Sequence, residues 1–130
     1  MSDFNPEIIY SYTRAQAIAD GVLIDVTSQA QEAGFKIPVA ISAALYHEYI
    51  VPPEGTEESE GQSLEGRLHD AFWMLKAAAS TRWDKDHVSF RVLFLTKAVP
   101  RTLSEVECWA IVGPDDDGRP CLTIMLPSDY

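Results

Sequence analysis

Apolar residues recur along the stretch Ser63–Ser80 with the spacing of one helix face. The positions that share this face are Leu64, Leu68, Ala71, Phe72, Leu75, Ala78 and Ala79. Spacings of three and four residues place such side chains on one stripe of an α-helix. Ser63 suits the N-cap position, and Glu65 puts a negative charge in the first turn, where it favours the helix dipole. We therefore predict the main helix of the chain over this stretch.

Trp73 does not fit the apolar stripe of the main helix. At ~100° per residue it lies about half a turn from the stripe centre, beside Gly66, His69, Lys76 and Ala77. One interpretation is that a loop or strand covers the indole from the other side. The other is that Trp73 anchors a protein partner, because Trp is enriched at interface hot spots. His69 lies one turn before Trp73 and would share that contact.

Alternating apolar and polar residues predict three strands in the C-terminal half, over His87–Lys97, Glu105–Val112 and Cys121–Leu126. Short links between them favour an antiparallel meander, covered on one face by the main helix. We therefore expect an α+β fold with short N-terminal helices and one main helix packed on a three-stranded antiparallel meander. The whole chain, residues 1–130, is expected to form a single domain.

The N-terminal half carries the signals of short elements. Residues 1–9 are expected to be a tail, and Thr13 with Gln16 forms a capping-box sequence before a helix that Gly21 ends. The short elements expected are helices over Arg14–Asp20, Gln29–Ala33 and Val39–Tyr49, and a strand or extended link over Val22–Val26.

Residues 51–62 form the clearest loop of the chain. They combine Pro52 and Pro53 with two glycines and no base. The acids of this segment are Glu54, Glu57, Glu58 and Glu60. Without hydrophobic periodicity such a segment is expected to be a mobile acidic loop.

The net charge of -10 is large for 130 residues. Residues 1–66 carry 11 acids against Arg14 and Lys36, whereas residues 67–130 nearly balance, with 9 acids against 8 bases. This charge argues against direct binding to nucleic acid or to an anionic membrane. It favours a basic protein partner or imitation of nucleic acid, and it also serves plain solubility.

Composition points to a cytoplasmic protein. The first residues contain no basic segment followed by an apolar one, so we expect no signal peptide, and no apolar run reaches membrane-spanning length. Cys108 and Cys121 fall in predicted strands and are interpreted as reduced core thiols.

The motifs that would mark an enzyme are missing from the sequence. It has no Gly-rich phosphate loop, Cys-x-x-Cys pair or His-Glu-x-x-His helix. Asp115–Gly118 begins like a calcium loop, but Leu126 stands where the closing glutamate should be, so a hairpin turn is expected. The spacing of His47, His69 and His87 indicates no metal site. We therefore expect no catalytic residue, no metal and no other cofactor.

Two stretches of the chain resemble a known family. Tyr10–Val26, followed by Ala33–Val39, resembles the opening of a family of small bacterial proteins of uncharacterised function, and Pro120–Pro127 resembles its closing strand. The resemblance implies a cytoplasmic protein that is often carried on plasmids, integrated elements or phages. It supplies no reaction and no site residues. Within these motifs, Tyr10, Tyr12, Arg14 and Asp25 either ring a polar pocket or form a hydrogen-bonded clamp on the N-terminal segment.

These observations lead to one main hypothesis and one alternative. The main hypothesis is a non-enzymatic binding or regulatory protein of a mobile genetic element, with an acidic surface and Trp73 against a protein partner. Its sharper form is an inhibitor of host defence that imitates nucleic acid with the acids of residues 54–65. The alternative is a small-molecule hydrolase or transferase with a cleft near Tyr12, Arg14 and His69. A homo-oligomer joined through the sheet or the main helix is compatible with each.

Overall fold

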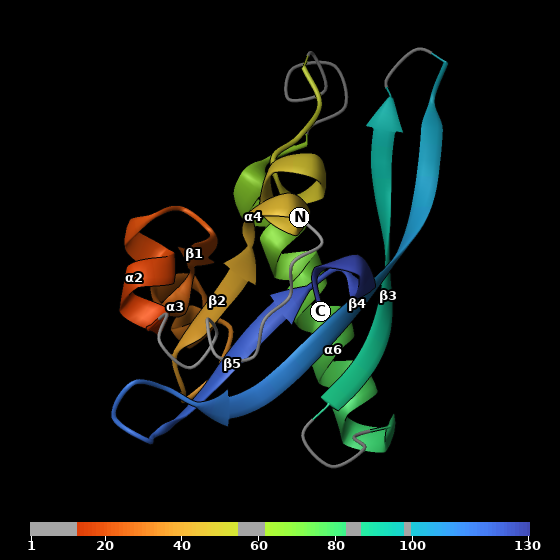
Figure 1. The fold of residues 1–130 in the computed structure, drawn as a ribbon. Coiled ribbons are helices and arrows are strands. Elements are labelled where there is room, and N and C mark those ends of the chain that lie inside the picture. The colour runs from red at the N-terminus through yellow and green to blue at the C-terminus, as the bar shows by residue number, and fades with distance from the viewer. Residues whose placement is uncertain (1–12, 55–61, 83–86, 98–99) are drawn as a thin grey trace.

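The computed structural model describes residues 13–54, 62–82, 87–97 and 100–130 of the 130-residue chain. Its elements follow one another as shown in Figure 1. They are the helices α2 (Arg14–Ala19), α3 (Thr27–Glu32), α4 (Ala43–Leu45) and α6 (Leu64–Arg82), the strands β1 (Leu23–Asp25), β2 (Val39–Ser42), β3 (His87–Lys97), β4 (Thr102–Pro114) and β5 (Pro120–Met125), the π-helical turn η1 (Tyr46–Ile50) and the 3-10 turn η2 (Pro127–Asp129).

The described strands form one mixed sheet with the order β1-β2-β5-β4-β3. Strand β4 pairs antiparallel with both β3 and β5, whereas β2 pairs parallel with β5 and antiparallel with β1. The α+β class is thus as expected. The expected sheet of three strands is wrong, because β1 and β2 from the N-terminal half extend it to five strands.

Strand β2 occupies part of the stretch Val39–Tyr49 that we predicted as one helix. All four residues of β2 are buried, and β1 and β5 flank it in the sheet. A strand buried on both faces shows no alternation of apolar and polar residues, so periodicity does not distinguish it from a buried helix. The helical turns begin only at Ala43, with the Ser42 hydroxyl accepting a bond from Leu45 N at 3.3 Å.

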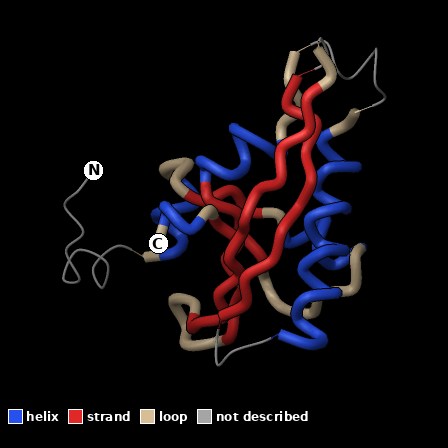
Figure 2. The backbone as a smooth tube through the Cα atoms, turned by 90° about the vertical axis from the view of Figure 1, so that its right-hand side faces the viewer, coloured by secondary structure: helices blue, strands red, loops and turns tan. Residues whose placement is uncertain are grey.

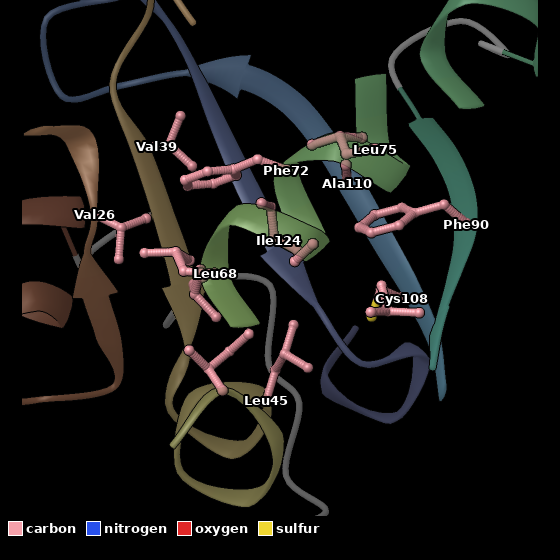
Figure 3. Close-up of a cluster of buried hydrophobic side chains, with 14 of the residues drawn as sticks. Val26, Val39, Leu45, Leu68, Phe72, Leu75, Phe90, Cys108, Ala110 and Ile124 are labelled. Carbon is pink, nitrogen blue, oxygen red and sulfur yellow. The ribbon is translucent and has the colours of Figure 1, made fainter. Parts of the chain in front are cut away.

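Helix α6 packs across one side of the sheet and confirms the predicted main helix (Figure 2). The Ser63 hydroxyl caps its first turn by accepting a hydrogen bond from Gly66 N at 3.0 Å. Figure 3 shows Leu68, Phe72 and Leu75 packed among side chains of β2, β3, β4 and β5. The largest fully buried side chains are Phe72, Phe90, Ile41, Leu45, Ile50, Leu68, Leu75, Ile124, Val26, Val39 and Val88.

The long hairpin of β3 and β4 reaches past the rest of the sheet (Figure 1). Its register pairs Phe90 with Cys108 and Val92 with Val106, and all four side chains are buried under α6. The residues between them face the other side of the sheet, where Leu93 is 60% exposed. The predicted alternation is confirmed from Val88 to Phe94, but Leu95, predicted on the opposite face, is buried next to Phe94.

Arg67 is a buried charge within the apolar side of α6 and was not anticipated. Only 3% of it is exposed. Its guanidinium donates hydrogen bonds to the carbonyl oxygens of Tyr49, at 2.7 Å, and of Leu95, and to Gln62 Oε1 at 3.1 Å. It also lies 5.5 Å from the centre of the Phe94 ring. Burial lowers the pKa of Arg67, while the charge of Asp70 opposes this effect. These bonds join α6 to η1 and to β3.

Candidate functional site

Trp73 lies on the side of α6 that faces away from the sheet. It is 66% exposed, and the neighbouring Met74 is 40% exposed. The interpretation that a loop or strand covers the indole is therefore wrong. The physical reason is that α6 forms an outer layer of the fold, so that the side opposite Leu68, Phe72 and Leu75 has solvent beyond it.

Polar side chains lie beside Trp73 along the same helix. His69 and Asp70 are exposed one turn before it. Lys76 turns away toward the end of α3, where its ammonium donates a hydrogen bond to the carbonyl oxygen of Ala33 and lies 5.3 Å from the Phe35 ring centre. We call the exposed residues His69, Asp70, Trp73, Met74 and Ala77 the outer face of α6.

A hollow of about 410 Å³ lies between α3 and the first half of α6. The residues that line it are Gln29, Glu32, Ala33, Glu65, Gly66, Leu68, His69 and Phe72. Leu68 and Phe72 are buried and form the floor, whereas Gln29, Glu32, Glu65 and His69 are exposed and form the rim. We call it the α3–α6 hollow. It adjoins the outer face of α6 through His69, which belongs to both.

Arg14 takes part in the joint between α2 and the sheet. Its guanidinium donates to Thr123 Oγ1 at 2.7 Å and to the Leu122 carbonyl oxygen at 2.8 Å. The backbone amides of Arg14 and Ala15 donate to the carboxylate of Asp116 at 2.8 and 3.0 Å. The predicted capping box of Thr13 and Gln16 is confirmed at the same end of α2.

Asp25 lies two residues before Thr27, the first residue of α3, and its carboxylate accepts hydrogen bonds from the amide and the hydroxyl of Thr27 at 3.1 and 2.5 Å. Asp25 and Arg14 line one shallow hollow of about 220 Å³, together with residues of the β4–β5 turn. Tyr10 and Tyr12 lie outside the described residues. The polar pocket and the clamp therefore both stay predictions.

The enzyme alternative required Tyr12, Arg14 and His69 to converge on one cleft. Arg14 lines the hollow at α2, whereas His69 lines the α3–α6 hollow, and the two hollows share no lining residue. In addition, the Arg14 guanidinium is bonded to β5. Among the residues that the structure describes, the side chains this cleft needs are therefore not brought together.

The two cysteines, Cys108 and Cys121, are buried and have free thiols. Burial raises the pKa of the Cys108 thiol to about 12, and it also raises the pKa of Cys121. Because the thiolate is the nucleophilic form, neither thiol is activated at neutral pH. Within the described ranges no three His, Cys, Asp or Glu side chains gather in a way that could hold a metal ion.

Asp115–Gly118 forms the hairpin turn that the sequence predicted. The Asp115 carboxylate accepts from the amides of Asp117 and Arg119, each at 2.9 Å. Gly118 has φ +82°, a left-handed conformation that suits glycine. The carboxylates of this turn therefore serve the turn itself and the start of α2.

Of the acids assigned to the loop 51–62, Glu54 is described and exposed. Glu57, Glu58 and Glu60 lie outside the described residues. Residues 51–54 and 62–63 belong to neither helix nor strand, in agreement with a loop.

The model of a family of unknown function, DUF6573, matches the chain over residues 1–130. The chain belongs to the DUF6573 family. Membership agrees with the resemblance to an uncharacterised family, and it assigns no activity. No curated protein and no solved structure matches the chain. No helix in the described part of this DUF6573 chain has the length and apolar character needed to cross a membrane.

A second group of aromatic residues on this DUF6573 chain lies on the sheet face opposite α6. Trp109 contacts the His87 ring with ring centres 4.7 Å apart and the Tyr130 ring with centres 5.6 Å apart. Its indole N–H donates to Glu107 at 3.1 Å, and the Ser89 hydroxyl donates to the same carboxylate at 2.8 Å. These bonds lower the pKa of Glu107, with the Ser89 bond as the largest cause.

This aromatic group and the α3–α6 hollow were not predicted from the sequence. Both are built from elements that lie far apart in the chain. A signal for the aromatic group existed, because the alternation of β4 placed Trp109 on the face opposite Cys108. Nothing in the sequence indicated that α3 lies beside the first half of α6.

Proposed function

We propose that this DUF6573 protein is a non-enzymatic binding protein that contacts a protein partner with the outer face of α6. The observation that carries the proposal is the 66% exposure of Trp73 beside the partly exposed Met74. Trp and Met are enriched at protein interfaces, and a Trp that becomes buried on binding contributes strongly to affinity. Among the described residues, Trp73 has no hydrogen-bond partner and no ring contact that would assign it a role within the fold.

The charge of the protein supports a basic partner. The chain has a net charge of -10, and Glu65 and Asp70 are exposed on the same helix as Trp73. Opposite charges on two proteins speed their encounter, and salt weakens that effect. We expect the complex to form faster at low salt than at high salt.

In this proposal the protein serves a mobile genetic element and regulates a protein of the host cell. The support is the resemblance of the opening and closing motifs to proteins carried by plasmids, integrated elements or phages. The sharper form is inhibition of host defence by imitation of nucleic acid. The acidic segment 54–65 supports it, since the exposed Glu54 and Glu65 stand at its two ends.

The proposal is tested by capture from a lysate of the native host, with mass spectrometry to identify what binds. Wild-type protein and the Leu93→Ala variant are expected to capture the same partner at low salt and to release it at high salt. The Trp73→Ala variant is expected to capture much less of it. Leu93 is a matched control, because it is 60% exposed but lies on the sheet. Capture that neither salt nor Trp73→Ala changes would count against the proposal.

The nucleic-acid imitation has its own test. The purified partner is incubated with labelled duplex DNA, and increasing amounts of this protein are added. Imitation predicts that the protein displaces the DNA and that charge removal at Glu54 and Glu65 weakens displacement. A ternary complex that retains the DNA would reject the imitation and leave the protein contact standing.

A further inference from the structure

We infer that the α3–α6 hollow binds a basic side chain of the partner, an arginine or a lysine, next to the contact with Trp73. This inference rests on the proposed function for the source of that side chain. The hollow itself is a separate site from the indole, and it can be tested without the partner.

The rim of the hollow presents two carboxylates from two different helices. Glu32 belongs to α3 and Glu65 to the first turn of α6, and both side chains line the hollow and are exposed. Neither carboxylate has a hydrogen bond or an ion pair with another described residue. None of the residues that line the hollow in the described part of the chain is Lys or Arg. The charge of the lining residues is therefore complementary to a cation.

The floor of the hollow suits the aliphatic part of such a side chain. Leu68 and Phe72 lie at the bottom, and each is 2% exposed. Arg and Lys bury their methylene stems along apolar surface while the charged end stays at the polar rim. The volume of about 410 Å³ falls within the range of roughly 300–1,000 Å³ that small-molecule sites occupy.

The chain places one of its own cations beside this hollow, at the end of α3. Lys76 reaches across from α6, donates to the Ala33 carbonyl oxygen and lies over the Phe35 ring. Ala33 also lines the hollow. Gly34 leaves room for this contact, because a Cβ there would lie 2.8 Å from the Lys76 ammonium nitrogen. The boundary between α3 and α6 thus already accommodates one ammonium group, on a carbonyl oxygen and an aromatic ring.

The position of the hollow ties it to the proposed contact. His69 lies on its rim and, one turn later along the helix, Trp73 is exposed. A partner segment that covers the indole can therefore place a neighbouring basic side chain into the hollow. The pairing of an apolar contact with a charged one would give the complex both affinity and register.

The probe for the test is N-acetyl-arginine amide, titrated into the isotope-labelled protein and followed by NMR. The control ligand is N-acetyl-citrulline amide, which has a similar shape and no charge. We expect the arginine compound to shift the backbone amides of residues 29–33 and 65–72 in a saturable manner. The citrulline compound is expected to bind at least about tenfold more weakly, a difference of about 1.4 kcal/mol.

Variants locate the binding and separate it from the contact at Trp73. The double variant Glu32→Gln/Glu65→Gln is expected to lose the saturable shifts. Glu48→Gln removes an exposed acid of η1 outside the hollow and should leave them unchanged, as should Trp73→Ala. Shifts that are absent, equal for citrulline or insensitive to the double variant would overturn the inference. Arginine binding with a partner affinity unaffected by Trp73→Ala would instead overturn the proposed function alone.

Discussion

Arg67 and Trp73 lie on one helix and occupy opposite environments. Arg67 is only 3% exposed, and its guanidinium bonds to three different segments of the chain. Trp73 is 66% exposed, although its ring is among the most apolar groups of the protein. The fold therefore buries the charged side chain and leaves the aromatic one exposed to solvent.

Replacement of Arg67 by Met is expected to destabilise the fold strongly. It leaves the part-buried carbonyl oxygen of Tyr49 and the buried one of Leu95 without this donor, so we expect a loss of about 3 kcal/mol in the free energy of unfolding. Urea denaturation measures it. The matched control is Arg91→Met, which breaks the exposed ion pair with Glu105 at 3.1 Å and should cost less than about 1 kcal/mol. Equal losses for the two variants would contradict the structural role of Arg67.

Cys108 gives the stability of the fold a dependence on alkaline pH. Burial raises its pKa from 9.0 to about 12, so the folded protein keeps the thiol proton in a pH range where the unfolded chain loses it. The unfolded state then binds fewer protons, and the free energy of unfolding falls as the pH rises from about 9 toward 12, with this stabilisation fully present below that range.

The measurement is urea denaturation at several alkaline pH values for the wild type and for Cys108→Ala. The wild type is expected to lose up to about 1.4 kcal/mol more per pH unit than the variant. Parallel curves for the two proteins would show that the thiol ionises in the folded state as it does in the unfolded chain.

Helix α2 shows how a short element depends on its tertiary partners. It has only 6 residues, and isolated helices of that length are unstable in water. Its first turn is capped twice: locally by the Thr13 hydroxyl, and from the β4–β5 turn by the Asp116 carboxylate. The turn between two strands therefore helps to hold a helix at the other end of the sequence.

Removal of the carboxylate in Asp116→Ala is expected to cost about 1–2 kcal/mol, the effect of losing an N-cap. Hydrogen exchange of the Arg14 and Ala15 amides, which donate to it, should become faster. Asp117→Ala is the matched control, because the neighbouring Asp117 side chain accepts no bond from α2. If both variants behave alike, the cap does not determine the stability of α2.

The elements that periodicity predicted are those with one buried and one exposed side. This holds for α6 and for the alternating strands β3 and β4. Helix α2 was predicted from its capping box instead. Strand β2 is buried throughout. Its apolar run therefore shows no alternation, and it was predicted as part of a helix. The five-stranded sheet was therefore not predicted either, because the parallel pairing of β2 with β5 joins two distant segments of the chain.

The candidate site was only partly visible in the sequence. The helical period placed Trp73 outside the apolar stripe, and Glu65 and His69 were known to lie on the same helix. Helical periodicity does not predict whether another element covers a residue, so the exposure of Trp73 could be established only from the structure. The α3–α6 hollow needed it too, because Glu32 and Glu65 meet there only through tertiary packing.

At the scale of the whole molecule, the proposed function gives the net charge and the contact surface different roles in binding. In the proposed function, the net charge of -10 would attract a basic partner over distances of about a Debye length, and the outer face of α6 would then supply the apolar contact. The encounter rate should therefore fall with salt, while the dissociation rate should depend mainly on Trp73. Stopped-flow measurements on the purified complex separate the two rates. A salt effect confined to dissociation would contradict this division.

The most direct test of the account is the affinity of the purified partner for the wild type, for Trp73→Ala and for Leu93→Ala. If α6 carries the contact, Trp73→Ala raises the dissociation constant by about 30-fold or more, the effect of a hot-spot residue of about 2 kcal/mol. Leu93→Ala, on the opposite face of the sheet, leaves it within about twofold. The reverse order, with Leu93→Ala costly and Trp73→Ala neutral, would place the contact on the sheet and contradict the account.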